Sequence, residues 1–289
     1  MNVTQCCLLF ACLTFVFVTP QAAHAQSAPN PADGDTSRRR LGTRLPKQKG
    51  ATAKELSARC TKGDLHGCSA LAYLMLKGEG TAKNVKRAKE LFESNCKQGQ
   101  LADCTNLGNL VSQGTARTPG NPKRARQLYR RACDGGHGIG CMNLAAMAEK
   151  GLGGPINVAR AAALYRQACD KKQLFGCTQL GLLTQAGRGV SKDAAAARKL
   201  FEQACSGSEV HGCTKLGFML DAGIGGPKDH EKAAHVFGNA CKWGSGEACL
   251  SIAEKMEQGH GVKQNKDQAK LYYGLACDRG LKQACKKRR

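Results

Sequence analysis

A nine-residue box with a cysteine at each end, Cys-x7-Cys, occurs seven times in this chain. The first cysteines of successive boxes are 36 residues apart in five steps and 37 residues apart in one. A fixed period of this length indicates an array of repeated units and excludes one compact globule with a single core. The seven boxes are Cys60–Cys68, Cys96–Cys104, Cys133–Cys141, Cys169–Cys177, Cys205–Cys213, Cys241–Cys249 and Cys277–Cys285.

The residues before each box have the spacing of an amphipathic helix. Apolar side chains recur at i, i+3, i+4 and i+7, which places them in one stripe along a helix. Because this spacing already accounts for the aromatic residues in the stripe, we interpret them as core residues. Four such stripes are Ala125, Leu128, Tyr129, Ala132; Ala161, Leu164, Tyr165, Ala168; Ala197, Leu200, Phe201, Ala204; and Ala233, Val236, Phe237, Ala240.

A second helix is expected after each box. A leucine or isoleucine lies three residues past the second cysteine: Leu71, Leu107, Leu144, Leu180, Leu216 and Ile252. The next position always holds a small residue: Ala72, Gly108, Ala145, Gly181, Gly217 and Ala253. Glycine within a helix costs about 1 kcal/mol relative to alanine, so this column predicts close approach of two helices.

The box itself must contain a turn. Two cysteines eight residues apart on one helix would be separated by about 12 Å, whereas a disulfide needs Cα atoms within about 7 Å. Glycines that would break the helix are Gly63, Gly99, Gly135, Gly207, Gly244 and Gly280, and the fourth box has Lys171 and Lys172 instead. We therefore predict that each unit is a helical hairpin closed by a disulfide within its own box.

The amino-terminal segment predicts export. Residues 1–25 contain no Asp, Glu, Lys or Arg, include an apolar run of about a dozen residues, and end in an Ala-x-Ala motif. We expect a secretory signal peptide cleaved after Ala25; a lipoprotein modified at Cys12 and an uncleaved anchor are the alternatives. Removal of three cysteines with the signal leaves 14 of 17, an even number that suits a secreted or periplasmic disulfide protein.

The rest of the chain divides into two parts. Residues 26–50 hold six basic and two acidic residues with few apolar ones, so we expect a disordered basic linker. Residues 51–289 form the array of seven repeats. The last repeat is truncated because only Lys286 to Arg289 follow Cys285.

Glycine-rich segments separate the repeats and are followed by Pro122, Asn157, Asp193, Asp229 or Asn265 at the expected start of the next helix. A Gly-x-Gly sequence alone could indicate a phosphate loop, but these recur in every unit between two helices, so we interpret them as helix caps. The alternative is that the cysteines of the boxes bind zinc, since His66, His137 and His211 lie within three of the boxes and could be further ligands. Cys-x7-Cys is not a zinc-ligand spacing, so we expect neither a metal nor a cofactor.

These motifs resemble those of the Sel1-like repeat, and the added Cys-x7-Cys box resembles secreted cysteine-rich Sel1-like proteins of the Helicobacter type. The shared pattern is Leu-Gly-x-Leu/Met, then Gly-x-Gly-Val, then Asp/Asn-x3-Ala-x2-Leu-Phe/Tyr-x2-Ala-Cys. The resemblance implies an all-α fold, a right-handed α/α solenoid similar to tetratricopeptide arrays, whose first helices line a concave face. It implies either an interaction scaffold or a weak penicillin-binding, β-lactamase-like hydrolase.

The hydrolase alternative has one sequence feature. Ser94 and Lys97 form an S-x-x-K motif, but neither of the two further serine β-lactamase motifs is present in the sequence. About one such match is expected by chance in this composition, and Cys96 of the motif belongs to a box. We therefore favour a scaffold over an enzyme and assign no catalytic residue.

The net charge of +22 bears on the choice of partner. The linker and the last four residues carry +4 each, which leaves +14 on the array. Such a charge suits attachment to an anionic envelope surface or to acidic proteins, although a merely solvated basic surface is equally compatible. Nucleic acid is not expected, because the few aromatic residues are mostly assigned to the core and leave no stacking platform.

The resemblance places a partner on the first helices, which we take as those before each first cysteine. Positions two and six before that cysteine lie beside the apolar stripe and carry polar side chains that could bind an extended, acidic peptide. A solvated polar face is the alternative, and we expect the protein to be a monomer. The candidate binding residues are Gln127, Arg131, Gln167, Lys199, Gln203, His235 and Asn239.

Overall fold

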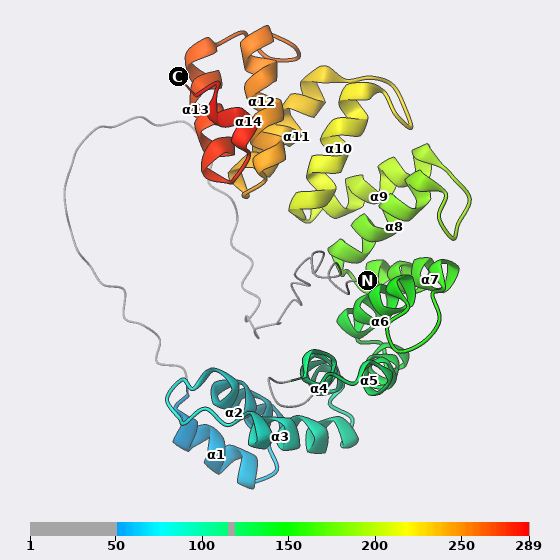
Figure 1. Cartoon of the computed structure of the whole chain (residues 1–289), viewed down its shortest axis with the longest axis vertical. Helices are drawn as coiled ribbons and strands as arrows, with labels where there is room; N and C mark the ends of the chain where they lie inside the picture. The colour runs from blue at the N-terminus through cyan, green and yellow to red at the C-terminus, as the bar shows by residue number, and fades with distance from the viewer. Residues whose placement is uncertain (1–50, 115–118, 289) are drawn as a thin grey trace, which may run out of the picture. The chain divides into compact units, whose positions relative to one another are not determined.

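The computed structural model describes residues 51–114 and 119–288, and these residues form an all-helical array (Figure 1). The predicted signal peptide and the predicted linker lie outside the described residues. The helices in the described part are α1 Ala53–Thr61, α2 Leu65–Lys77, α3 Val85–Lys97, α4 Leu101–Gln113, α5 Pro122–Asp134, α6 Gly138–Lys150, α7 Val158–Asp170, α8 Leu174–Ala186, α9 Ala194–Ser206, α10 Val210–Ala222, α11 His230–Lys242, α12 Gly246–Gln258, α13 Lys266–Asp278 and α14 Lys282–Cys285.

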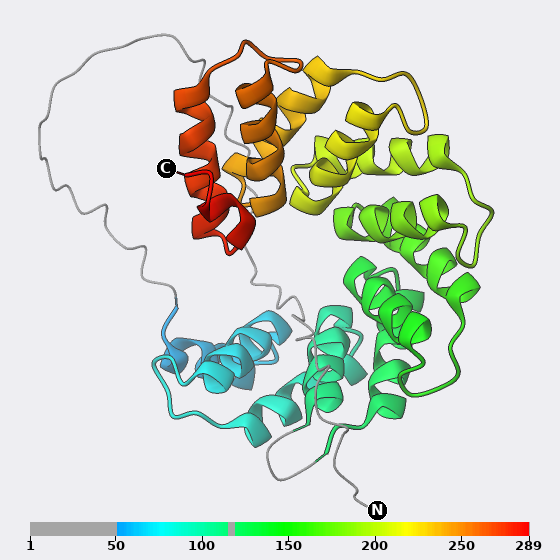
Figure 2. The same ribbon diagram turned by 45° about the horizontal axis from the view of Figure 1, so that its top comes forward.

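The chain forms two compact units, one ending at Leu91 and the other beginning at Phe92, so the boundary falls within α3. In the first unit α1 packs on α2. In the second unit each helix from α6 to α12 packs on both the helix before it and the helix after it (Figure 2). The second helices of neighbouring hairpins also touch, as α4 and α6 do. This stacking of hairpins confirms the predicted α/α solenoid architecture.

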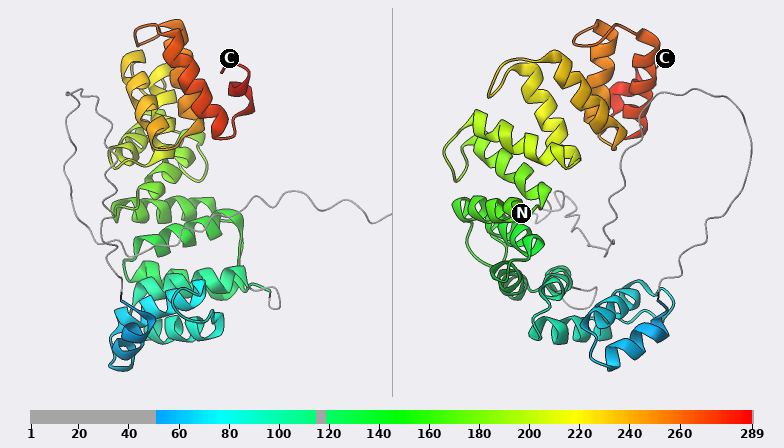
Figure 3. Two further views of the ribbon diagram at one scale, coloured as in Figure 1. Left: turned by 90° about the vertical axis from the view of Figure 1, so that its left-hand side faces the viewer. Right: turned by 180° about the vertical axis from the view of Figure 1, so that it is seen from behind.

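The seven disulfides connect the cysteines of each box, as the sequence predicts. Their Cα–Cα distances are 4.4 to 4.8 Å. Each bond joins the last turn of one helix to the first turn of the next across a short reversal of the chain. The seventh hairpin is closed in the same way although α14 has only four residues and lies beside α13 (Figure 3).

The turn inside each box differs from the prediction in detail. The residue in the left-handed conformation is always the third after the first cysteine, and it is Lys172 in the fourth box and Ser208 in the fifth. Gly135 and Gly207 precede that position and have negative φ, so their predicted role as helix breakers is wrong. A Cβ at Gly207 would instead collide with Leu174, the first residue of α8 in the preceding hairpin. These two glycines permit close packing between hairpins.

The helix ends follow the predicted capping chemistry. From α5 to α13 each first helix of a hairpin begins after an Asn or Asp whose side chain accepts a hydrogen bond from the backbone N–H three residues on. Helices α2, α6, α8, α10 and α12 end at a glycine with φ between 69° and 80°. The glycine two residues further on, such as Gly261 after Gly259, also has positive φ, and a Cβ there would collide with the backbone at His230. A helix cap at the first glycine and close packing at the second therefore explain the Gly-x-Gly sequences after α6, α8, α10 and α12.

The core is a row of aromatic side chains, each fitted against a small residue. Tyr129, Phe201 and Phe237 are buried, as predicted. A Cβ added at Gly217 would lie 2.5 Å from the Phe237 ring, and one at Gly181 would lie 2.7 Å from Phe201. The small-residue column thus admits the aromatic ring of the following helix. This contact joins the second, fourth and fifth hairpins to the hairpins that follow them.

Candidate functional site

The structure places all seven predicted binding residues on the first helices of four successive hairpins. Six of these side chains are exposed and Asn239 is half-buried. The residues are Gln127 and Arg131 on α5, Gln167 on α7, Lys199 and Gln203 on α9, and His235 and Asn239 on α11. The sequence pattern therefore identified a solvent-facing polar row.

Two residues of this row reach back to the preceding hairpin. Arg131 Nη2 donates a hydrogen bond to the carbonyl oxygen of Lys97 at 3.2 Å, at the carboxyl end of α3. The Gln167 side-chain oxygen lies 3.4 Å from the sulfur of Cys133, against the disulfide of the third box. A cation beside the last carbonyls of a helix is favourable. These contacts fix the two side chains along the seam between successive hairpins.

A pocket of about 260 Å³ lies where α5 meets α3 and α4, and it contains two residues of the row. Gln127 and Arg131 form part of its wall, and the apolar side chains of Leu107 and Leu128 also line it. Its one acidic residue is Glu93. No contact between described residues brings the remaining five row residues into a single site, so this pocket is the part of the row with a defined shape.

The charges around this pocket are predominantly positive. Arg124 Nη2 lies 2.8 Å from Glu93 Oε1, and Lys97 Nζ lies 3.6 Å from the same oxygen. Glu93 thus already forms ion pairs with two cations of this same chain. Helix α5 contributes five basic residues and one acidic residue. The pocket and its rim therefore present net positive charge to an incoming ligand.

The S-x-x-K motif lies on the last turns of α3. The Ser94 hydroxyl accepts a hydrogen bond from the Gln98 side-chain amide at 3.2 Å, and Lys97 pairs with Glu93. Cys96 is locked in its disulfide. No interaction in the described chain joins Ser94 to Lys97. This arrangement does not supply the base that an activated serine needs.

Buried tyrosines have their hydroxyl groups engaged within the core. Tyr129 donates to Asn109 at 2.6 Å, and Asn143 donates to the same oxygen at 3.2 Å. Burial raises the pKa of Tyr129 well above its usual range. Burial likewise raises the pKa of Tyr165, whose hydroxyl donates to Glu149 at 3.3 Å. These hydroxyl groups stabilise contacts between hairpins and are closed to a substrate.

Two further polar clusters were not anticipated from the sequence. Lys255 is buried and pairs with Asp221, which also contacts His230 Nδ1 at 2.6 Å. Burial acts to raise the pKa of Asp221, but these hydrogen bonds outweigh it and lower the pKa. A repeat-to-repeat comparison of the second helices could have flagged Lys255, because neighbouring repeats carry apolar residues at its position. The cluster joins α10 to α12 and is structural.

The second cluster lies at the carboxyl end of the array. The Tyr273 hydroxyl donates to Glu257 at 2.6 Å, and Lys287 Nζ lies 3.2 Å from the same carboxylate. The hydrogen bond from Tyr273, which is the larger cause, and the hydrogen bond from Lys287, which is the smaller one, hold the pKa of Glu257 below its usual range. Lys287 thereby ties the basic tail to α12 and α13.

The histidines of the boxes do not gather into a metal centre. His137 Nδ1 lies 3.0 Å from the Thr105 hydroxyl, and burial lowers the pKa of His137. Within the described ranges no three His, Cys, Asp or Glu side chains are grouped as metal ligands. None of the helices described has the length and hydropathy of a membrane span.

Helical hairpins stacked in chain order, with aromatic side chains of one hairpin packed against small residues of the hairpin before it, define an α/α repeat protein. The Sel1 repeat family profile matches six segments: 65–100, 102–137, 138–172, 175–208, 210–238 and 246–281. Because these segments cover more than half of the chain, the protein belongs to the Sel1 repeat family. Five of the segments run from the second helix of one hairpin through the first helix of the next, and the segment 210–238 ends within α11. The family unit is therefore offset by one helix from the disulfide-closed hairpin.

Two solved structures, those of c5321 and of the Oxalobacter protein, show the same fold. The crystal structure of c5321, a protective antigen of uropathogenic Escherichia coli strains, is 23% identical with a TM-score of 0.75, over 81% of this chain and 50% of that chain. A Sel1 repeat protein from Oxalobacter formigenes is 22% identical with a TM-score of 0.68, over 78% and 90% of the two chains. Helicobacter pylori cysteine rich protein B is 29% identical with a TM-score of 0.38, over 45% and 93%.

This chain therefore spans half the length of the c5321 chain. No curated protein matched the sequence.

Proposed function

We propose that this protein is a secreted or periplasmic scaffold that binds an extended acidic segment of a partner protein. The observation that carries the proposal is the pocket between α3, α4 and α5, in which Gln127 and Arg131 stand over apolar side chains. An amide and a guanidinium at the edge of an apolar hollow suit a peptide that carries both a carboxylate and an apolar side chain.

The polar row extends the pocket along the array. Gln167, Gln203 and Asn239 occupy the same helical position as Arg131 in the three following hairpins. Side-chain amides at a regular spacing can hydrogen-bond the backbone of an extended chain, each bond contributing about 1 kcal/mol net. The pocket would anchor one residue of the peptide, and the row would align the rest.

Export to an oxidising compartment is the second part of the proposal. Seven disulfides within single hairpins suit a secreted or periplasmic protein, because thiols stay reduced in the cytosol. The leader ending at Ala25 would direct this export. The basic residues 26–50 and the basic tail would hold the scaffold near an anionic envelope surface.

The test uses a fluorescein-labelled ten-residue peptide of alternating Glu and Leu, with a Lys-Leu peptide as the charge control. Fluorescence anisotropy should show binding of the acidic peptide that weakens as salt rises, and no binding of the basic one. Simultaneous replacement of Arg131, Gln167, Gln203 and Asn239 by alanine should weaken binding at least tenfold. The charge-matched control is Arg166→Ala, an exposed arginine of α7 outside the row, which should leave affinity within twofold.

Retained affinity in the folded fourfold variant would refute the row and direct attention to the basic linker and tail. Pull-down with the oxidised protein from an envelope extract then identifies the natural partner. Its binding segment should be acidic and extended, and the same fourfold variant should fail to retain it.

A further inference from the structure

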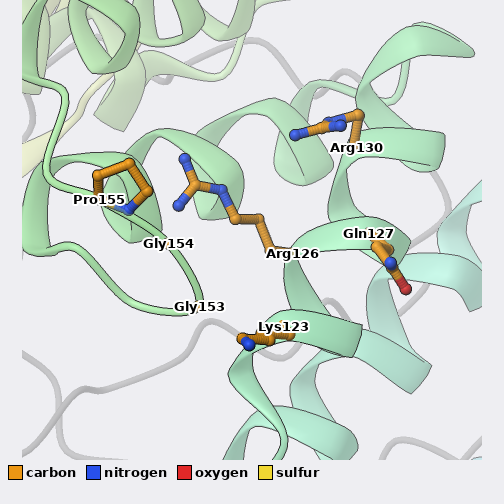
Figure 4. Close-up of a pocket in the computed structure, with 7 residues that line it drawn as sticks. All are labelled: Lys123, Arg126, Gln127, Arg130, Gly153, Gly154 and Pro155. Carbon is orange, nitrogen blue, oxygen red and sulfur yellow. The ribbon is translucent and has the colours of Figure 1, made fainter.

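A second pocket, of about 350 Å³, lies on another side of α5, against the loop between α6 and α7. Its charged lining consists of Lys123, Arg126 and Arg130, with no acidic residue, and residues 153–155 close the other side. Figure 4 shows Arg126 extending from α5 toward Gly154 and Pro155, with Lys123 and Arg130 placed along the helix on either side. Of its lining residues, only Gln127 also belongs to the pocket proposed for the peptide.

The fifth repeat contains the same construction with its charge already balanced. The loops Gly151–Pro155 and Gly223–Pro227 differ only by Leu against Ile at the second position. Arg198 of α9 occupies the position of Arg126, and a Cβ at Gly226 would lie 2.7 Å from its Nη1. Arg198 Nη1 donates to the Pro227 carbonyl at 3.0 Å, and its Nε lies 3.7 Å from the Glu202 carboxylate. This arginine therefore has a carbonyl acceptor and a carboxylate partner within the protein.

In the third repeat the balancing carboxylate is missing. Arg130 stands where α9 has Glu202, and Lys123 stands where α9 has an alanine. Arg126 Nη1 is buried and has no hydrogen-bond partner among the described residues. In the described part of the chain, Lys123, Arg126 and Arg130 form no ion pair. A buried guanidinium N–H without an acceptor, beside two further cations, is unfavourable unless an anion completes the site.

We propose that this pocket binds a tetrahedral oxyanion with two negative charges, namely phosphate, sulfate or a phosphate monoester. The planar guanidinium of Arg126 can donate two parallel hydrogen bonds to two oxygens of such a group. The guanidinium of Arg130 and the ammonium of Lys123 can pair with the remaining oxygens. A carboxylate supplies only one charge and two oxygens for three cations. The volume also leaves room for the sugar or small organic group that an ester would carry.

The test measures the thermal unfolding midpoint of the oxidised full-length protein against phosphate concentration at constant ionic strength. Inorganic phosphate and sulfate should raise the midpoint in a saturable manner, while acetate should not. Glucose 6-phosphate separates the two sources: tighter binding than inorganic phosphate indicates an ester ligand, and equal binding indicates the free oxyanion.

Matched variants locate the site. Arg126→Gln should weaken phosphate binding at least tenfold, and so should the double variant K123Q/R130Q, which changes only exposed side chains and serves if R126Q fails to fold. Arg198→Gln, at the engaged equivalent position, should leave the phosphate dissociation constant within twofold of the original. An unsaturable phosphate effect, or an unchanged constant in K123Q/R130Q, would overturn the proposal.

Discussion

Removal of the central disulfide by C205A/C213A should destabilise the array by a predictable amount. The bond closes a loop of nine residues, since the cysteines are eight apart in sequence. On the chain-entropy model a loop of that length stabilises the folded state by about 2.6 kcal/mol at 25 °C. The helices it joins also pack on α8 and α11, so the loss should weaken the fold without detaching either helix.

The assay is thermal and urea unfolding followed by circular dichroism. For a protein of this size, about 2 to 4 °C is lost per kcal/mol, so the melting midpoint should fall by roughly 5 to 10 °C. The urea midpoint should fall as well, because the loss of the cross-link favours the unfolded chain.

The seventh disulfide provides the matched control. The loop of Cys277–Cys285 has the same length, but it holds only the four-residue α14 at the end of the array. If C277A/C285A lets α14 detach, the loss is limited to the docking energy of one short helix, and the midpoint should fall by less than half as much. A central variant that melts within 1 °C of the original would refute the stapling argument.

Three further outcomes are expected. Ser208 has φ of 65°, so S208G should stabilise the protein by about 0.5 to 1 kcal/mol in urea unfolding. Gly244 has φ of 111°, so G244A should destabilise the protein. A change of stability with the same sign in both variants would contradict the turn geometry. Because hydrogen bonds from Tyr273 and Lys287 lower the pKa of Glu257, its stabilising effect should be complete above its unfolded pKa of about 4.3 and lost as pH falls through the folded pKa. E257Q should therefore differ from the original protein near neutral pH and converge with it in acid, and a constant difference across that window would disprove the linkage. Nitrocefin should not be turned over by the purified oxidised protein, and measurable hydrolysis would revive the enzyme hypothesis.

The sequence by itself determined the repeat, the helical hairpin and the pairing of all fourteen cysteines in the array. These properties follow from local rules, because a Cys-x7-Cys box can close only if the chain reverses between its ends. The apolar stripe and the small-residue column likewise fix which faces of the two helices meet. Such features recur every 36 residues, so each repeat supports the interpretation of the others.

What the tertiary structure decided depends on contacts between neighbouring repeats. Gly207 looks like a helix breaker in the sequence, yet it serves to admit Leu174 of the preceding hairpin, and Ser208 makes the turn. Arg126 and Arg198 occupy equivalent places before nearly identical loops, and only their surroundings show that one is engaged and the other is not. Periodicity reports what the repeats share, whereas a binding site arises where one repeat departs from the others, and the consequence of that departure depends on which side chains the fold places around it.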